Sequence, residues 1–141
     1  LDVVQAVVAT WDDGAALQAF VVTSASAPDA GGLEDDLAAS LDTALVPAPV
    51  ADADVAFRHA EGALYTACDV GAADRPGLLH ALAVGIASAG ADIHAARVTT
   101  DGGLAHDRFD LSDRAGRRLD PFREAAVRAA VTTGIEMARV P

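Results

Sequence analysis

The order of secondary-structure patterns in the second half of the chain restricts its fold more than any other sequence feature. From about residue 63 onward the patterns read strand, helix, strand, strand, helix, strand. A strand–helix–strand crossover within one sheet is right-handed, so this order predicts an α+β, ferredoxin-like βαββαβ sandwich with both helices on one face of an antiparallel sheet. The six elements are expected at residues 63–71, 76–90, 93–100, 104–111, 120–134 and 135–140.

Residues with strong backbone preferences mark the ends of these elements. Pro76 suits the first turn of a helix, and Gly90 suits its left-handed cap. Asp120 followed by Pro121 is typical of a helix N-terminus. A change of phase near His94 predicts a β-bulge in the second strand.

The first half of the chain repeats part of this order. Residues 2–10 align with 92–100. The turn that follows is one residue shorter in the second copy, and beyond it Phe20 and Val22 align with Phe109 and Leu111. A helical pattern follows, and residues 54–59 then form a closing strand. The same order over some forty residues favours common origin over chance similarity of short Ala/Val strands. The helical pattern rests on Leu33, Leu37, Leu41 and Leu45.

The first copy lacks the opening strand and helix of the second. The expected domains are therefore a partial repeat at 1–53 and a complete domain at 54–141, joined by the Pro- and Ala-rich segment 47–54. A chain that starts inside a domain indicates a fragment, and strand 15–23 would keep an open edge. Open apolar edges recruit partners, so we expect sheet pairing with the second copy or with another chain, and a homo-oligomer.

Composition excludes several functional classes. The formal net charge is −11 and all ten basic residues are Arg, with no basic stripe, so binding to nucleic acid or to an anionic membrane surface is not expected. No apolar run reaches the length of a membrane-spanning helix. The single cysteine, Cys68, allows no intrachain disulfide, which favours a cytoplasmic location and a buried, unreactive thiol.

The chain shows no catalytic motif, and no cofactor site is expected. We find no convergent acid, base and nucleophile. His106-Asp107 is a lone pair on a strand without further metal-ligand spacing, so no metal site is expected there.

The segment from Asp74 to Leu78 has two interpretations. Free N–H groups at a helix N-terminus attract a carboxylate, and Gly77 would let a ligand approach the backbone. Arg75 could then add a charged fork and Asp74 could take an ammonium group. In the alternative, Asp74 caps the helix and Pro76 begins it.

The Asp-Arg-Pro-Gly-Leu-Leu segment at 74–79, followed by Gly-Ala-Asp-Ile-His at 90–94, resembles ACT domains. The resemblance is strongest to the tandem ACT pair at the C-terminus of PII-protein uridylyltransferases, which are nitrogen sensors. It implies a regulatory region that binds an amino acid, glutamine in that family, and pairs with another ACT copy by sheet or helix. The alternative is a structural dimerisation module that binds nothing. The implied ligand residues are Asp74, Arg75, Pro76, Gly77, Leu78, Asp92 and Ile93.

Overall fold

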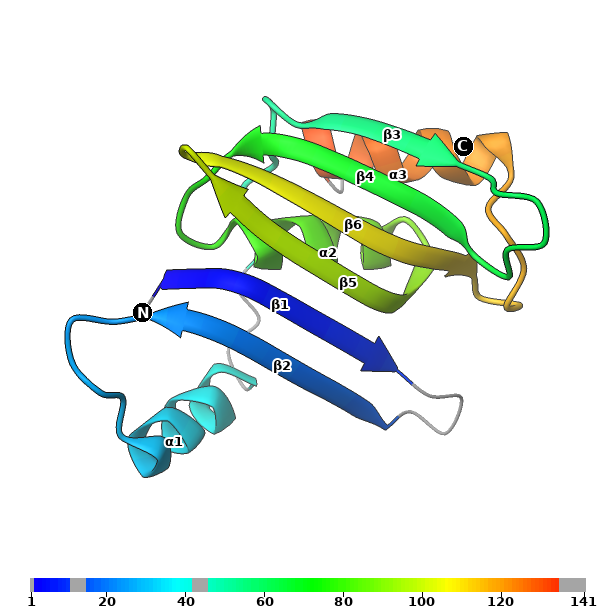
Figure 1. Cartoon of the computed structure of the whole chain (residues 1–141). Helices are drawn as coiled ribbons and strands as arrows, with labels where there is room; N and C mark the ends of the chain where they lie inside the picture. The colour runs from blue at the N-terminus through cyan, green and yellow to red at the C-terminus, as the bar shows by residue number, and fades with distance from the viewer. Residues whose placement is uncertain (1, 11–14, 42–45, 135–141) are drawn as a thin grey trace.

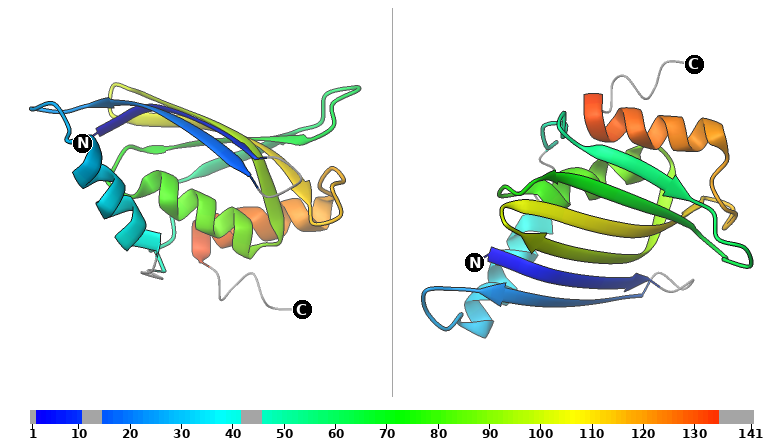
Figure 2. Two further views of the ribbon diagram at one scale, coloured as in Figure 1. Left: turned by 90° about the horizontal axis from the view of Figure 1, so that it is seen from below. Right: turned by 45° about the horizontal axis from the view of Figure 1, so that its top comes forward.

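The computed structural model describes residues 2–10, 15–41 and 46–134 of the chain. Within these residues it has nine helices and strands in all, in the order β1 (Asp2–Thr10), β2 (Ala16–Thr23), α1 (Ala30–Leu41), β3 (Asp54–Arg58), β4 (Thr66–Ala73), α2 (Leu78–Ser88), β5 (Ala91–Asp101), β6 (Leu104–Asp113) and α3 (Pro121–Thr133). The strands form one sheet in the order β2-β1-β5-β6-β4-β3, and every neighbouring pair is antiparallel (Figure 1). The three helices lie on one face of it (Figure 2).

The part of the sheet that contains β4, β5 and β6 is compatible with the predicted ferredoxin-like fold. Helix α2 connects β4 to β5, β6 returns as a hairpin, and α3 follows it. Strand β4 lies between β6 and β3, so β3 occupies the edge position that a ferredoxin-like sheet gives to its closing strand. The strand expected at 135–140 lies outside the described residues. The α+β class is confirmed. The strand expected at 54–59 to close the first copy pairs instead with β4 of the second copy, so that part of the prediction is wrong.

The core lies between this part of the sheet and helices α2 and α3. Phe109 of β6 and Leu82 of α2 are fully buried in it. Cys68 is also buried, and burial raises the pKa of its thiol to about 12, as expected of an unreactive core cysteine. Val50 belongs to this core and its N–H donates to the carbonyl of Val131 at 2.8 Å, so the segment expected to be a plain linker is partly built into the fold.

The two β-hairpins β1–β2 and β5–β6 have the same register under the sequence alignment of the two halves. Both ladders also shift at the aligned place, between Val3 and Gln5 in one and between Ile93 and Ala95 in the other. The bulge predicted near His94 is thus confirmed, and it occurs twice. The matching cross-strand pairs are Val3–Val22 with Ile93–Leu111, Gln5–Val21 with Ala95–Asp110, and Thr10–Ala16 with Thr100–Ala105.

The contact between the two hairpins is symmetric under the same alignment. Strands β1 and β5 pair antiparallel, with Val7 opposite its aligned residue Arg97. Gln5 lies opposite Thr99, and Ala9 lies opposite Ala95, which is the same pair with the roles exchanged. A local two-fold axis therefore passes between Val7 and Arg97, at the centre of the pairing.

Candidate functional site

The loop between β4 and α2 leaves the N-terminus of α2 without a side-chain cap. Gly77 is the N-cap residue, with φ 79° and ψ 3°, and no side chain of the described residues hydrogen-bonds there. Apart from Gly77 and its two chain neighbours, no atom in the described part of the chain lies within 4 Å of the position where a Cβ of Gly77 would stand. The interpretation in which Asp74 caps the helix is therefore wrong, and Pro76 precedes the first turn of α2 instead of starting it, because the helix begins at Leu78. The uncapped N-terminus faces open space.

One hydrogen bond ties the loop to the β5–β6 turn, and another closes a turn within the loop. The N–H of Asp74 donates to the carbonyl of Gly103 in the β5–β6 turn at 2.9 Å, and the N–H of Leu78 donates to the carbonyl of Arg75 at 3.1 Å. Asp74, Pro76 and Gly77 are exposed, whereas the side chain of Leu78 is buried in the core. The loop thus offers its backbone to solvent, and Leu78 anchors it.

Arg75 already has a carboxylate partner. Its Nη2 lies 2.8 Å from Oδ1 of Asp52, and Oδ2 of Asp52 accepts from the N–H of Ala73 at 3.0 Å. The hydrogen bond from Arg75, followed by that from Ala73, lowers the pKa of Asp52 to about 2. The Arg75 guanidinium, which the sequence suggested for a ligand, is therefore neutralised by Asp52. Asp52 comes from the segment before β3 that the sequence analysis treated as a linker.

Asp92 and Ile93 do not lie beside this loop. They pair with Ser112 and Leu111 of β6, at the end of the sheet where β4 begins, whereas the loop leaves the other end of β4. Seven residue steps along β4 correspond to about 23 Å. The structure therefore brings Asp74 to Leu78 together and separates them from Asp92 and Ile93.

The β1 residues that align with Asp92 and Ile93 lie at the same end of the sheet as the 74–78 loop. Gln5 pairs with Thr99, and β1 extends from there to Asp2 beside the last residues of β5. The turn that follows β5 is the one that binds the N–H of Asp74. Asp2 and Val3 align with the predicted ligand residues Asp92 and Ile93. The first half of the chain therefore supplies the corresponding strand backbone at the end of the sheet where the loop lies.

Asp107 is a buried carboxylate that sequence reasoning missed. It lies on the helix-facing side of β6 between the core residues Ala105 and Phe109, its residue is 3% exposed, and its Oδ1 has no hydrogen-bond partner in the described part of the chain. Burial raises the pKa of Asp107 to about 6; the negative charge of Asp74 adds to this, while His106 and a backbone hydrogen bond at Thr99 oppose it. Its inward strand position was the available signal.

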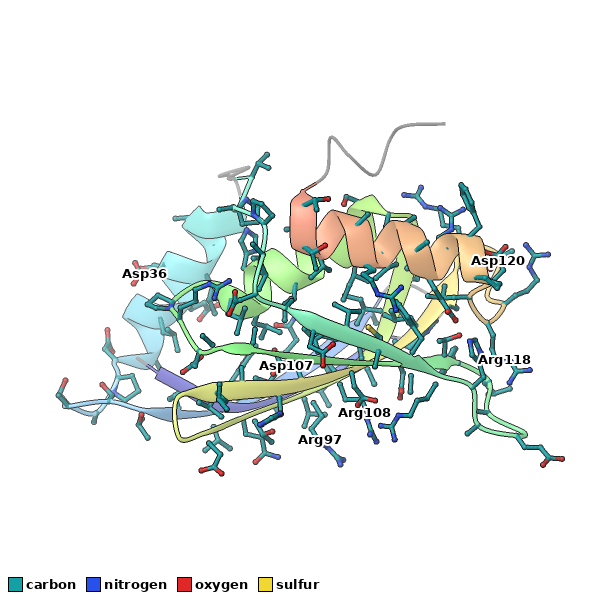
Figure 3. All side chains as sticks on the ribbon, turned by 90° about the horizontal axis from the view of Figure 1, so that it is seen from above. Asp36, Arg97, Asp107, Arg108, Arg118 and Asp120 are labelled. Atoms are coloured by element: carbon teal, nitrogen blue, oxygen red, sulfur yellow. The ribbon has the colours of Figure 1, made fainter. Side chains whose placement is uncertain are left out.

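The outer face of the sheet has a different character. Arg97 and Arg108 lie opposite each other on β5 and β6 and point away from the helices (Figure 3). Arg108 and Arg58 share the carboxylate of Asp69. An open cavity of about 790 Å³ beside Arg58 and Tyr65 lies on another part of the surface than the 74–78 loop.

In the described residues, no group of His, Cys, Asp and Glu side chains could hold a metal ion. None of the helices in the described part is long and apolar enough to cross a membrane.

The chain is similar to several bacterial enzymes over about half of its length. It is 35% identical over 79 residues to a bifunctional uridylyltransferase/uridylyl-removing enzyme of Bradyrhizobium sp., which is 55% of this chain and 8% of the enzyme. The enzymes of that name from Bradyrhizobium diazoefficiens and Aliivibrio fischeri are 38% identical over 69 and 64 residues, in each case 7% of the enzyme.

No protein-family model matches the chain, and no solved structure matches it significantly. The chain spans less than a tenth of the length of the relatives named above. Over about half of its own length, the chain is thus related by sequence to a short region of bifunctional uridylyltransferase/uridylyl-removing enzymes.

Proposed function

We propose that the chain is a regulatory region of a PII-protein uridylyltransferase, made of one complete ACT domain and part of a second, and that it binds an amino acid, glutamine first among the candidates. The relatives supply the enzymatic context, since all carry the same uridylyltransferase name. The matching register of the two hairpins and the symmetric β1–β5 pairing support two copies of one unit.

The uncapped N-terminus of α2 is the observation that carries the binding proposal. Backbone N–H groups at a helix N-terminus and the positive end of the helix dipole favour a carboxylate. At α3 the same position is filled by Asp120, whose side chain accepts from the N–H of Arg123 at 2.7 Å. At α2 the position is held by Gly77, with open space around it. The contrast between the two helices favours a ligand carboxylate at α2.

The proposed site lies between the two copies. The loop 74–78 supplies the helix N-terminus, and the first residues of β1 lie at the same end of the sheet. The extended backbone of β1 can offer N–H and C=O groups to the polar atoms of an amino acid. Binding would then depend on how the copies pair, which is how a small molecule can act on attached domains.

Isothermal titration calorimetry of the 141-residue chain with each of the twenty amino acids tests this function. We expect saturable binding of L-glutamine, and at least a tenfold loss of affinity in Gly77→Asn, because Asn tolerates a positive φ and places a side chain over the helix N-terminus. Gly116→Asn is the matched control: it has φ 77° and open surroundings, and it lies in the turn after β6. Equal affinity in Gly77→Asn and in the parent chain would contradict this site.

A dimerisation module is the second candidate, and strand β2 supports it. This strand is at the edge of the sheet and exposes apolar side chains on both faces. Such an edge can pair with another chain. Absence of binding by any amino acid, together with a mass that increases with concentration in light scattering, would favour this function. The exposed residues are Leu17, Phe20, Val21 and Val22.

A further inference from the structure

Asp107 is a buried group that the loop geometry alone does not explain. A carboxylate that is nearly inaccessible, and that finds no partner for one oxygen among the described residues, is costly to bury because it loses hydration. Natural proteins keep such groups rarely, so each one calls for an explanation, and a functional role or a bound ligand is one. The neighbouring inward residues of β6, Ala105 and Phe109, are ordinary core residues. Asp107 therefore interrupts an otherwise apolar strand face.

The position of Asp107 relates it to the 74–78 loop. Asp107 lies opposite Val70 of β4, three residues before β4 ends at Ala73, and the loop begins directly after that. After burial, the negative charge of Asp74 in this loop is the second cause of the raised pKa of Asp107. The loop is also tied to the β5–β6 turn that leads into the strand of Asp107. Asp107 thus lies on the helix-facing side of the sheet, three residues from the end of β4 that leads into the loop.

We propose that Asp107 receives the ammonium group of the amino acid whose carboxylate binds at the N-terminus of α2. This inference rests on the proposed function and names the residue that distinguishes a zwitterion from a simple carboxylate. A ligand ammonium would supply the missing donor at Oδ1 and compensate the buried charge. Asp74, Pro76 and Gly77 are exposed whereas Asp107 is buried, so a ligand that reaches both groups would require the loop to move.

The proposal has a proton-linked consequence. Without ligand, Asp107 is partly protonated near pH 6, since the pKa of its carboxyl is raised to about 6. An ammonium group favours the ionised carboxylate, so binding at pH 6 releases a fraction of a proton, and binding at pH 8 releases almost none. Below pH 6, the affinity for the amino acid should therefore increase by up to about tenfold for each unit by which the pH is raised. The charged neighbours Asp74 and His106 remain unchanged in a variant at position 107.

The test is calorimetric binding of L-glutamine and of 4-carbamoylbutanoate, which lacks the α-amino group, to three chains. These are the parent, Asp107→Asn and the control Asp110→Asn, whose side chain lies on the outer face of the same strand. We expect Asp107→Asn to bind glutamine at least tenfold more weakly than the parent and to bind the two compounds alike. Asp110→Asn should behave as the parent, and a thermal melt verifies that each variant is folded.

The outcomes separate this inference from the function on which it rests. If the parent binds glutamine and Asp107→Asn binds it equally well, Asp107 does not receive the ammonium group and the binding function stands. Equal losses in Asp107→Asn and Asp110→Asn would also overturn the inference, because they would reflect net charge. If no amino acid binds the parent, both proposals fail. Titrations at pH 6 in two buffers of different ionisation heat should show proton release in the parent and none in Asp107→Asn; no release in the parent contradicts the inference.

Discussion

The hairpins β1–β2 and β5–β6 have the same backbone register and different burial. Phe109 and Leu111 of β6 are 1% and 0% exposed, whereas the aligned Phe20 and Val22 of β2 are 47% and 38% exposed. Both pairs lie on the helix-facing side of the sheet, but α2 and α3 cover the second hairpin only (Figures 1 and 2). Register is thus determined by local pattern and turn length, while burial depends on which helices lie above the strands.

The comparison also explains why one hairpin has a perturbed carboxyl group. Gln18 of β2 aligns with Asp107 of β6, and Gln18 is exposed. The same strand position therefore gives a solvated polar side chain in one hairpin and a buried acid in the other. Cover by the helices, and not the strand itself, produces the raised pKa of Asp107.

The largest expected effect comes from removing the aligned aromatic side chains. Phe109→Ala leaves a cavity in the core and should lower the free energy of unfolding by about 3–5 kcal/mol. Phe20→Ala removes a half-exposed ring and should cost about 1 kcal/mol or less. Urea denaturation of the two variants and the parent measures the difference. Equal losses would mean that the first hairpin is covered in solution, for instance by a second copy of the chain.

A smaller effect is expected in the pH dependence of stability. The pKa of Asp107 is about 6 in the folded chain against 3.8 for an ordinary Asp, so the folded state holds this proton more tightly. The stabilisation is complete below about pH 4 and is lost as the pH rises to about 6. Relative to Asp107→Asn, the unfolding equilibrium constant of the parent should rise by up to about tenfold per pH unit in this range.

The matched control for this titration is Gln18→Asp. An aspartate at that exposed position should titrate normally in both states and add no slope. Thermal melts of the parent and both variants at pH 4, 5, 6 and 7 provide the comparison. A similar slope for Gln18→Asp, or no slope for the parent relative to Asp107→Asn, would disprove the link between helix cover and the titration.

Sequence patterns predicted the elements whose signals are local. The order from β4 to α3 follows from hydrophobic period and turn residues, and Asp120 acts as the N-cap of α3 as its sequence indicated. The bulge at His94 was visible as a change of phase. These features depend on residues within one element or one turn, so a single sequence contains the information.

The features that sequence reasoning missed depend on contacts between distant segments. Val50 enters the core through Val131, and Asp52 pairs with Arg75, although the segment around them has no apolar period. In the sequence Asp107 stood out only as part of a lone His-Asp pair; its strand position points inward, but its burial comes from the packing of helices on the sheet. The separation of Asp92 from the loop likewise follows from strand direction in the folded sheet.

The central claim is that the loop 74–78 and the start of β1 together bind an amino acid. Amide chemical shifts of the ¹⁵N-labelled chain during addition of L-glutamine test it most directly. We predict shifts at residues 74–79, at Asp107 and at the first residues of β1, with little change in the turn at Gly116 or around Arg58 and Tyr65. Absence of shifts at saturating glutamine, or shifts confined to the surface beside Arg58 and Tyr65, would contradict the claim.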